Sequence, residues 1–341
     1  MKRVRKSLIY TVIAVGFMAL ILDSQTAAKG AAEGIELCVR TVIPSLFPFF
    51  IISILLTVEL AGSEFTLFRP LGRLCKLPRG TESILLTGLL GGYPIGAHSI
   101  CTSFTSGKIS KAVAQHMLGF CNNAGPAFIF GMVGPLFHNN YVALLLWLIH
   151  IGSAIMTGII LPRTAAHEVM TTASPSDSFG QVMIKSIQAM ANVCGWVVIF
   201  RVILCFFSHW ILWVLPQHLQ ILLSGILELA NGCFELTSID NDSVRFVYAS
   251  VFLALGGICV LMQTTSAVSQ AGLDLGRYIP GKLTQASLSV ILAVPTANLI
   301  FPLEKRIPYT ILLLPLSCLM LLKIFMIARK NNSSIPAFTS V

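Results

Sequence analysis

The chain alternates long apolar blocks with short polar turns, and most of the blocks have the length of a membrane-spanning helix. A spanning helix needs about 20 mostly apolar residues. Blocks near or above that length cover residues 8–22, 37–60, 112–137, 141–161, 182–215, 244–271, 283–302 and 309–327. Two further stretches, residues 84–100 and 219–236, are shorter and interrupted by glycine. The pattern predicts an all-α polytopic membrane protein, with about eight transmembrane helices plus two re-entrant, hairpin-like segments.

The order of these segments predicts two structurally repeated halves. Each half has a long helix, then a short glycine-interrupted segment, then a helix broken by small residues, and finally ordinary spans. The halves are residues 35–162 and 181–328, joined by a polar linker at 163–180. Residues 1–34 form an N-terminal basic segment with the first transmembrane helix, and 329–341 form a disordered tail. Short, Gly/Pro-interrupted segments at matching positions of two halves are typical of transporter binding sites.

Composition agrees with this architecture. The chain has 341 residues, of which 55% are hydrophobic and only 11% charged. Soluble domains carry about 25% charged residues to cover a wet surface. The sequence therefore excludes a soluble globule, and the missing charge is explained if most of the outer surface faces lipid.

The net charge of +9 is distributed as a membrane signature, which argues against nucleic acid as a partner. If the two short segments enter the bilayer and return on the same side, most basic clusters fall on one face. These clusters are Lys2, Arg3, Arg5 and Lys6, then Arg69, Arg73, Lys76 and Arg79, then Lys108 and Lys111, Arg277 and Lys282, and Arg329 and Lys330. The positive-inside rule makes that face cytoplasmic. We expect a multi-pass protein of the cytoplasmic membrane with a cytoplasmic N-terminus. Exceptions on the other face are Lys29, Arg40, Arg245, Lys305 and Arg306.

The N-terminus has a second interpretation, because a basic start, an apolar run and small residues at 26–28 also describe a cleavable signal peptide. We expect a retained helix.

The nine cysteines are scattered, without a Cys-x-x-Cys pair, so neither a disulfide framework nor a metal site is expected. We expect no phosphate-binding Gly-x-x-x-x-Gly-Lys loop, and the sequence has no His-Glu-x-x-His motif and no serine in a nucleophile elbow. It predicts a protein that is not an enzyme and has no cofactor.

The first chemical signal is the run Gly91-Gly92-Tyr93-Pro94-Ile95-Gly96-Ala97-His98-Ser99. Three glycines and a proline cannot continue an ordinary helix, because proline lacks a donor and clashes with the preceding turn. A re-entrant hairpin with an exposed tip fits this run. The alternative is a packing motif, since Gly92-x-x-x-Gly96 matches a small-residue helix contact.

The second signal is Asn122-Asn123-Ala124-Gly125-Pro126 inside an apolar block. Adjacent amides in a membrane span are costly unless they are hydrogen-bonded. Gly125-Pro126 unwinds the helix beside them, so the amides either bind a polar, neutral or zwitterionic solute or brace the hairpin tip. Both roles are compatible.

The second half has its own polar residues in the corresponding positions. Glu228 and Asn231 lie in the second short segment, and Gln263 lies in the span that follows. Arg201 is a lone cation in an apolar block and pairs with Glu228 or extends to an interface. His116 and His150 are expected to be interhelical hydrogen-bonders. The candidate substrate-binding residues are Gly92, Tyr93, Pro94, Gly96, His98, Ser99, Asn122, Asn123, Gly125, Glu228, Asn231 and Gln263.

Four motifs together resemble a known family. They are Pro44-Ser45-Leu46-Phe47-Pro48-Phe49, the run from Gly91 to Ala97, the run from Asn122 to Gly131, and Gly232-Cys233-Phe234-Glu235-Leu236-Thr237. In order and spacing, over residues 35–325, they are similar to the YlbJ-type sporulation integral membrane proteins. Those are grouped with the nucleoside-recognition, or Gate-domain, membrane proteins. The resemblance implies a bacterial inner-membrane protein needed for spore development, with two Gate-like repeats.

Two functional hypotheses follow. The first is a sporulation-associated, transporter-like protein that binds or moves a small polar solute at a midplane site, by rocking of one half against the other. The second is a non-transporting scaffold or assembly factor for the spore envelope, with the hairpin packed shut and both asparagines satisfied internally. Besides the lipid bilayer, the partners compatible with these hypotheses are the solute, a second copy of the chain, and other sporulation membrane proteins.

Overall fold

The structure is a computed structural model that describes residues 2–59, 66–137, 139–162 and 178–332. Every element in these ranges is helical. The α-helices of the first half are α1 (Lys2–Leu22), α2 (Ser24–Leu37), α3 (Ile43–Glu59), α4 (Arg69–Leu74), α5 (Glu82–Leu90), α6 (Ile95–Thr105), α7 (Lys111–Leu118), α8 (Pro126–Phe128) and α9 (Asn140–Ile160). Those of the second half are α10 (Phe179–Trp210), α11 (Gln217–Leu227), α12 (Leu229–Glu235), α13 (Asp242–Leu255), α14 (Gly257–Gln270), α15 (Tyr278–Ile300) and α16 (Leu313–Asn332).

Within the described residues, six helical segments are long and apolar enough to cross a membrane. They are Ser24–Ile52, Tyr141–Ile160, Phe179–Trp210, Asp242–Gln270, Tyr278–Ile300 and Tyr309–Met326. The last segment is only 6% buried, and Leu314 on it is 76% exposed. Such an apolar outer surface requires lipid. The protein is therefore a multi-pass integral membrane protein, as the apolar pattern predicts.

The sequence predicts about eight spans, and the number of spans stays a prediction, because two of the predicted blocks are absent from these six segments for local reasons. The block at 8–22 lies in the 21-residue helix α1, of which Ile13–Leu22 is the apolar part. The block at 112–137 is not one span: α7 ends at Leu118, the chain is irregular to Gly125, and a second helical stretch covers Pro126–Phe137. Since Gly and Pro interrupt this block, its apolar length overstates the length of its helices.

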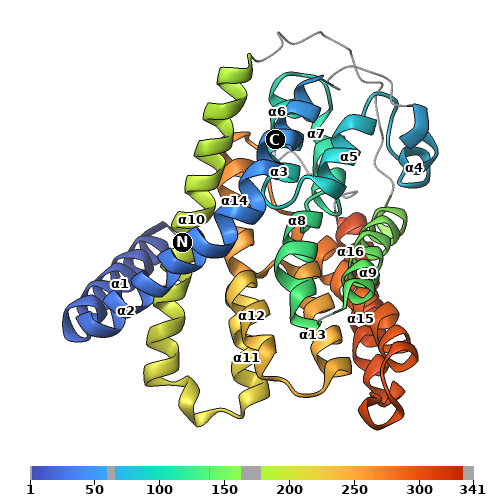
Figure 1. The fold of residues 1–341 in the computed structure, drawn as a ribbon. Coiled ribbons are helices and arrows are strands. Elements are labelled where there is room, and N and C mark those ends of the chain that lie inside the picture. The colour runs from blue at the N-terminus through green and yellow to red at the C-terminus, as the bar shows by residue number, and fades with distance from the viewer. Residues whose placement is uncertain (1, 60–65, 138, 163–177, 333–341) are drawn as a thin grey trace.

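The 32-residue helix α10 runs along one side of the molecule, and α1 and α2 form an arm that projects beside it (Figure 1). The arm is attached by close packing, because Gly30 and Gly34 of α2 face Val202 and Val198 of α10. A Cβ atom at either glycine would lie 2.8–2.9 Å from the valine Cα. The backbones of α2 and α10 are thus in direct contact, as small residues permit in membranes.

Among the described residues, two irregular segments in each half are important for the site. The first hairpin is the pair α5–α6, which turns at Gly91–Pro94, and the second hairpin is the pair α11–α12, which turns at Glu228. The first break is the irregular stretch 119–125 between α7 and α8, and the second break is Gly256–Gly257 between α13 and α14. Both predicted short segments are therefore helical hairpins. The two-fold repeat remains a prediction.

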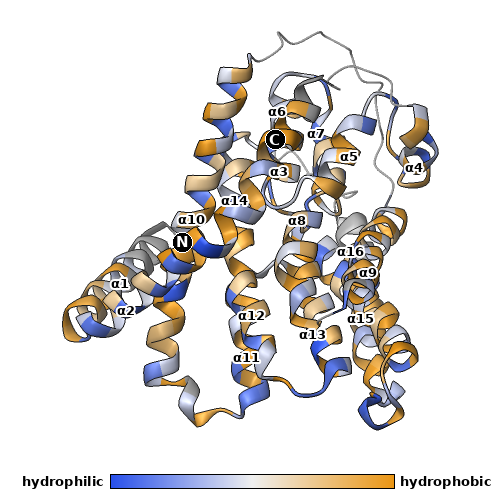
Figure 2. Ribbon diagram, in the orientation of Figure 1, coloured by the Kyte–Doolittle hydropathy of each residue, from blue (hydrophilic) through white to orange (hydrophobic). Residues whose placement is uncertain are grey.

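Hydrophilic residues are frequent at the two ends of the helices, and the part between the ends is mainly apolar, with single hydrophilic residues within it (Figure 2). One end carries α4, the α6–α7 turn and the α14–α15 turn. We call it the cavity end, for the cavity described below. The other end carries the turns before α13 and between α15 and α16, and we call it the clamp end. The helix α10 starts at the cavity end with a capping box, in which Ser178 and Gln181 exchange hydrogen bonds.

Candidate functional site

The tip of the first hairpin contacts the second break directly. Tyr93 is buried and donates its hydroxyl to the carbonyl of Leu253 at 3.1 Å. Its ring packs over Gly256, where an added Cβ would lie 3.0 Å from the Tyr93 Cζ. Gly256 has φ +74°, a conformation that a side chain would strain, so glycine both ends α13 and admits the tyrosine. The two halves meet at these residues.

The first break is held by its two asparagines, which are fully buried. Asn122 accepts from the Ala97 backbone N–H at 3.2 Å and donates to the Thr264 hydroxyl at 3.0 Å. Asn123 donates to the carbonyls of Gly88 and Phe120 and accepts from the Gln285 amide at 2.9 Å. These bonds brace the first hairpin, the first break and two helices of the second half. These hydrogen bonds correspond to the bracing role, and contact of the asparagines with a solute stays a prediction.

The second hairpin turns at a buried carboxylate. Glu228 accepts from the backbone N–H groups of Ala230 and Asn231, at 3.0 and 2.6 Å, and from the Asn231 amide at 2.8 Å, so it caps α12. Asn231 in turn accepts from Arg201 at 3.1 Å. The Arg201 guanidinium forms its ion pair with Glu33 of α2 at 2.7 Å. Arg201 therefore reaches Glu228 only through Asn231.

A small cavity of about 50 Å³ lies where these irregular segments converge. Its lining includes Gly92 and Tyr93 from the first hairpin, Gly125 from the first break, Glu228 from the second hairpin, and Gln263 from α14. We call it the central cavity. A space of this size holds a few water molecules at most. Glycine and proline breaks leave backbone and polar groups facing it, as irregular backbone in a membrane requires.

A larger cavity of about 430 Å³ lies between α6, α10 and α14, and we call it the outer cavity. Its polar lining includes His98, Ser99 and Thr102 from α6, Lys185 and Asn192 from α10, and Gln263 from α14. Lys185 and Thr102 belong to turns of α10 and α6 near the cavity end, so the outer cavity extends from that end inward. Gln263 lines both cavities. Its amide nitrogen reaches only the Cys259 sulfur, at 3.4 Å, among the described groups.

A residue that the sequence interpretation assigned to a surface cluster, Lys282, is buried beside this site. It lies in the first turns of α15 with 4% of its surface exposed. Its ammonium donates to the Tyr93 hydroxyl at 2.8 Å and to the Gln285 side-chain carbonyl at 2.9 Å. It also lies 4.9 Å from the Tyr93 ring centroid. The assignment of Lys282 to the basic surface cluster was wrong.

Two signals in the sequence bear on Lys282. The helix begins at Tyr278, one turn before the apolar block at 283–302, and Lys282, Gln285 and Ser289 share a polar stripe at helical spacing. The run from Gly276 to Lys282 also has the Gly-x-x-x-x-Gly-Lys spacing. However, Leu283 stands where the phosphate loop has Ser or Thr, and Lys282 lies within a helix rather than in a loop.

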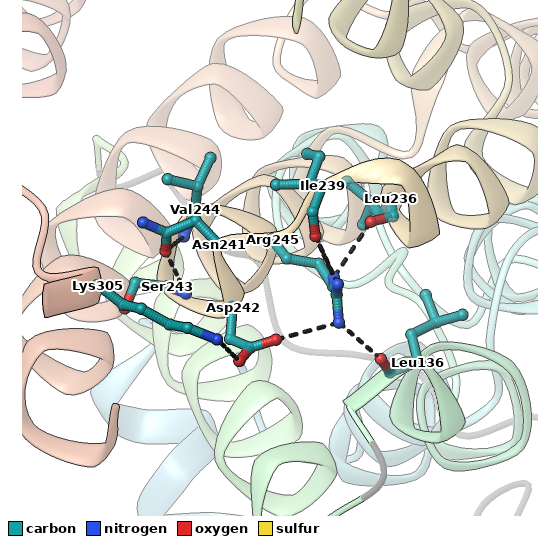
Figure 3. Close-up of polar contacts among 9 residues, drawn as sticks. All are labelled: Leu136, Leu236, Ile239, Asn241, Asp242, Ser243, Val244, Arg245 and Lys305. Carbon is teal, nitrogen blue, oxygen red and sulfur yellow. Dashed lines mark hydrogen bonds and ion pairs between the residues drawn. The ribbon is translucent and has the colours of Figure 1, made fainter. Parts of the chain in front are cut away.

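The clamp end is closed by a network around Arg245, shown in Figure 3. The Arg245 guanidinium donates to the carbonyls of Leu236, Ile239 and Leu136, at 3.0–3.1 Å, and pairs with Asp242 at 3.1 Å. Asp242 also pairs with Lys305 at 2.6 Å. Leu136 belongs to the first half, while the others belong to the second. We call this network the Arg245 clamp, and it fastens the two halves together at this end.

The structure thus divides the predicted residues into two groups. Those on the cavity walls are Gly92, Tyr93, Gly125, Glu228 and Gln263 at the central cavity, with His98, Ser99 and Gln263 at the outer one. Pro94, Gly96, Asn122, Asn123 and Asn231 are not among the lining residues and shape the segments behind the walls. Gly96 lets the first break approach, since a Cβ there would lie 2.3 Å from the Cys121 carbonyl oxygen. No group of three potential metal ligands occurs among the described residues.

Comparisons with known proteins agree with the resemblance drawn from the motifs. The sporulation integral membrane protein YlbJ of Bacillus subtilis (strain 168) is 24% identical over 320 residues, covering 80% of this chain and 78% of that protein. No protein-family model matches the chain, and neither does any solved structure. The chain is thus similar along most of its length to a sporulation integral membrane protein, which confirms the predicted resemblance.

Proposed function

We propose that this homologue of a sporulation integral membrane protein is a solute-binding protein of transporter type, not an enzyme, that serves spore development. The observation that carries the proposal is the pair of cavities that have Gln263 in their common wall. The outer cavity has polar side chains in its wall, and it shares Gln263 with the central cavity, where residues of both hairpins and of the first break converge. Discontinuous helices around a midplane site are the arrangement by which secondary transporters hold solutes.

The two ends of the molecule differ, and the difference supports an opening of this site toward one side of the membrane. The outer cavity extends from the cavity end, whereas the Arg245 clamp fastens the other end. Basic residues near the cavity end include Arg73, Lys108 and Lys111, and the positive-inside rule makes that end cytoplasmic. The proposal places the protein in the cytoplasmic membrane with its N-terminus inside, open toward the cytoplasm. Release of the clamp would then open the opposite side.

The experiment is a thermal-shift screen of the purified full chain in detergent, with nucleosides, amino acids, carboxylates and divalent metals as probes. A ligand at 100 times its Kd stabilises the folded state by about 2.7 kcal/mol. The variant that tests the site is Gln263→Leu, because Gln263 lines both cavities and its amide nitrogen makes one weak contact among the described residues. We expect at least one probe to raise the Tm of the parent chain and Gln263→Leu to lose most of that shift.

The matched control is Gln217→Leu, since Gln217 is exposed at the start of α11 and outside both cavities. It should keep the full ligand-induced shift. Asn122 and Asn123 are unsuitable for this test, because their bonds hold the fold and their loss would destabilise the apo protein. If the ligand raises the Tm of Gln263→Leu as much as that of the parent chain, the ligand binds at another site.

The scaffold function has one observation in its favour: Asn122 and Asn123 are satisfied within the protein, as a packed interior requires. It also requires a closed interior, which the outer cavity opposes. If no probe shifts the Tm of the parent chain, the transporter proposal fails. Cross-linking of the full chain in sporulating cells would then identify the membrane proteins that a scaffold assembles.

A further inference from the structure

Two charged side chains lie on the outer surface of the protein at the depth of the bilayer centre. The side chains of Glu36 in α2 and Arg40 in the π-helical turn Cys38–Val42 are 59% and 77% exposed. Both belong to Ser24–Ile52, one of the six segments long and apolar enough to cross a membrane, and they lie on either side of its middle. At about 1.5 Å per residue, each is within about 5 Å of that middle along the helix axis. The apolar block at 37–60 places Arg40 at the start of a span, whereas the helical segment of the structure begins at Ser24.

The bonding capacity of this pair is mostly unused. The Arg40 Nε pairs with a Glu36 carboxylate oxygen at 3.0 Å, and neither side chain has another partner among the described residues. A guanidinium has five N–H donors, and a carboxylate has about four acceptor sites. Charged groups at this depth are costly in lipid and face protein or a water-filled cavity instead.

The described neighbours offer neither of these surroundings. The helix α1, which forms the arm together with α2, contains no Asp or Glu that could pair with Arg40. Neither the central cavity nor the outer cavity has Glu36 or Arg40 in its lining. The exposed face around the two charges therefore requires a partner from outside this chain.

The same face of α2 has the small residues that a close helix contact needs. Its exposed residues include Ser24, Gln25, Ala28, Lys29, Ala32 and Glu36. Ser24, Ala28 and Ala32 follow one another at intervals of four residues, the spacing that lets two helix backbones approach in a membrane. The opposite face of α2, with Gly30 and Gly34, already packs on α10.

We infer that this face of α2 binds the same face of a second copy of the chain, around a two-fold axis along the membrane normal. Two copies in one membrane have the same orientation, so their α2 helices run parallel. In a parallel contact each side chain lies among residues up to one turn away on the facing helix, so Glu36 of each copy can pair with Arg40 of the other.

The pattern of charges is the reason for choosing a second copy as the partner. In a two-fold interface, residue i of one copy contacts residue j of the other, and j contacts i. An acidic and a basic residue one turn apart satisfy this condition, whereas a face with charges of one sign would repel its own copy. The two internal pairs then become one network of four charges shielded from lipid. This inference does not depend on the solute of the proposed function.

The test is disulfide cross-linking of the full chain in membranes, with Ala32→Cys on the exposed face as the reporter. Under oxidation by copper phenanthroline, Ala32→Cys should give a covalent dimer above the background of the nine native cysteines. Leu314→Cys, at an exposed position of α16, should stay at that background. When Glu36→Arg or Arg40→Glu is added to Ala32→Cys, like charges oppose each other, and the dimer fraction should fall at least fivefold.

Two rescue experiments distinguish loss of the interface from loss of the fold. The double reversal, Glu36→Arg with Arg40→Glu, is again self-complementary and should restore the dimer fraction to within twofold of that before the reversals. Co-expression of the two single reversals brings a basic face against an acidic one. It should give the mixed dimer, identified by a different tag on each chain. Arg306→Glu, a reversal at an exposed position outside this face, should leave the dimer fraction unchanged.

Cross-linking of Ala32→Cys no stronger than that of Leu314→Cys would overturn the inference. Rapid labelling of Ala32→Cys by a membrane-impermeant maleimide would do the same, because the face would then be open to water. A dimer fraction that neither reversal lowers would also overturn it, since the contact would not depend on the charges. If the single reversals keep the Tm of the parent chain but form no mixed dimer, another membrane protein rather than a second copy covers the face, and the inference fails. Solute binding is measured separately by the ligand-induced Tm shifts.

Discussion

The two ends of the molecule use their polar residues in opposite ways. At the clamp end, the Arg245 guanidinium is bonded to backbone carbonyls from both halves and to Asp242. At the cavity end, Gln263 and Asn192 line an open volume, and the amide of Gln263 makes one weak contact within the described protein. The difference teaches that the polar residues of the Arg245 clamp stabilise the fold, whereas Gln263 and Asn192 line the volume in which the proposed solute would bind.

The largest effect should come from removing the clamp. Arg245→Ala leaves the carbonyls of Leu136, Leu236 and Ile239 without this partner and Asp242 with Lys305 alone. Losing the charged partner of a partly buried network should cost about 3 kcal/mol or more. Thermal or denaturant unfolding in detergent measures it. The control Arg306→Ala, at an exposed position in the α15–α16 turn, should change stability by less than about 0.5 kcal/mol. If the two variants lose the same free energy of unfolding, the Arg245 clamp does not stabilise this end of the molecule more than an exposed arginine does.

The next largest effect on stability should come from the first break, which lies between the two ends. Asn123→Ala removes bonds to Gly88, Phe120 and Gln285, all of them buried. Leaving these groups unpaired should lower the free energy of unfolding by about 2–3 kcal/mol. The same measurement on Asn192→Ala, which removes an exposed amide from the outer cavity, should show a change below about 0.5 kcal/mol. If both variants cost the same, the asparagines of the first break are not a brace.

A smaller effect is expected from the outer part of the clamp. Lys305 is half-exposed and pairs only with Asp242 among the described residues, so Lys305→Ala should cost at most about 1 kcal/mol. The cost should diminish with added salt, because exposed ion pairs are screened. Unfolding at low and high ionic strength checks this. A loss as large as that of Arg245→Ala would show that the ion pair, rather than the carbonyl bonds, closes this end.

The smallest effect on stability should come from the cavity itself. Gln263→Leu should change the free energy of unfolding of the apo protein by no more than about 0.5 kcal/mol, since its amide has little to lose within the fold. Unfolding of the apo variant measures this. A large destabilisation would mean that Gln263 supports the structure like the residues of the clamp, and the contrast between the ends would disappear.

The irregular segments could be predicted from sequence, because glycine, proline and asparagine act locally. Gly91–Pro94 and Asn122–Gly125 lie where the chain breaks. Contacts between distant residues could not be predicted. Arg201 pairs with Glu33, 168 positions away, and no local pattern specifies that partner. Lys282 was misplaced because hydropathy sets the start of a span at the first apolar residue, whereas α15 begins a turn earlier. Burial of a lysine depends on what surrounds it in three dimensions.

The contact of Gly30 and Gly34 with α10 has a mechanical consequence. At these two glycines the backbone of α2 is packed directly against that of α10, so we expect the two helices to move together. The α1–α2 arm is then attached to α10, the helix that forms one wall of the outer cavity. A spectroscopic label on the exposed face of the arm would amplify small rotations of α10, and so would report opening and closing of the cavity from outside it.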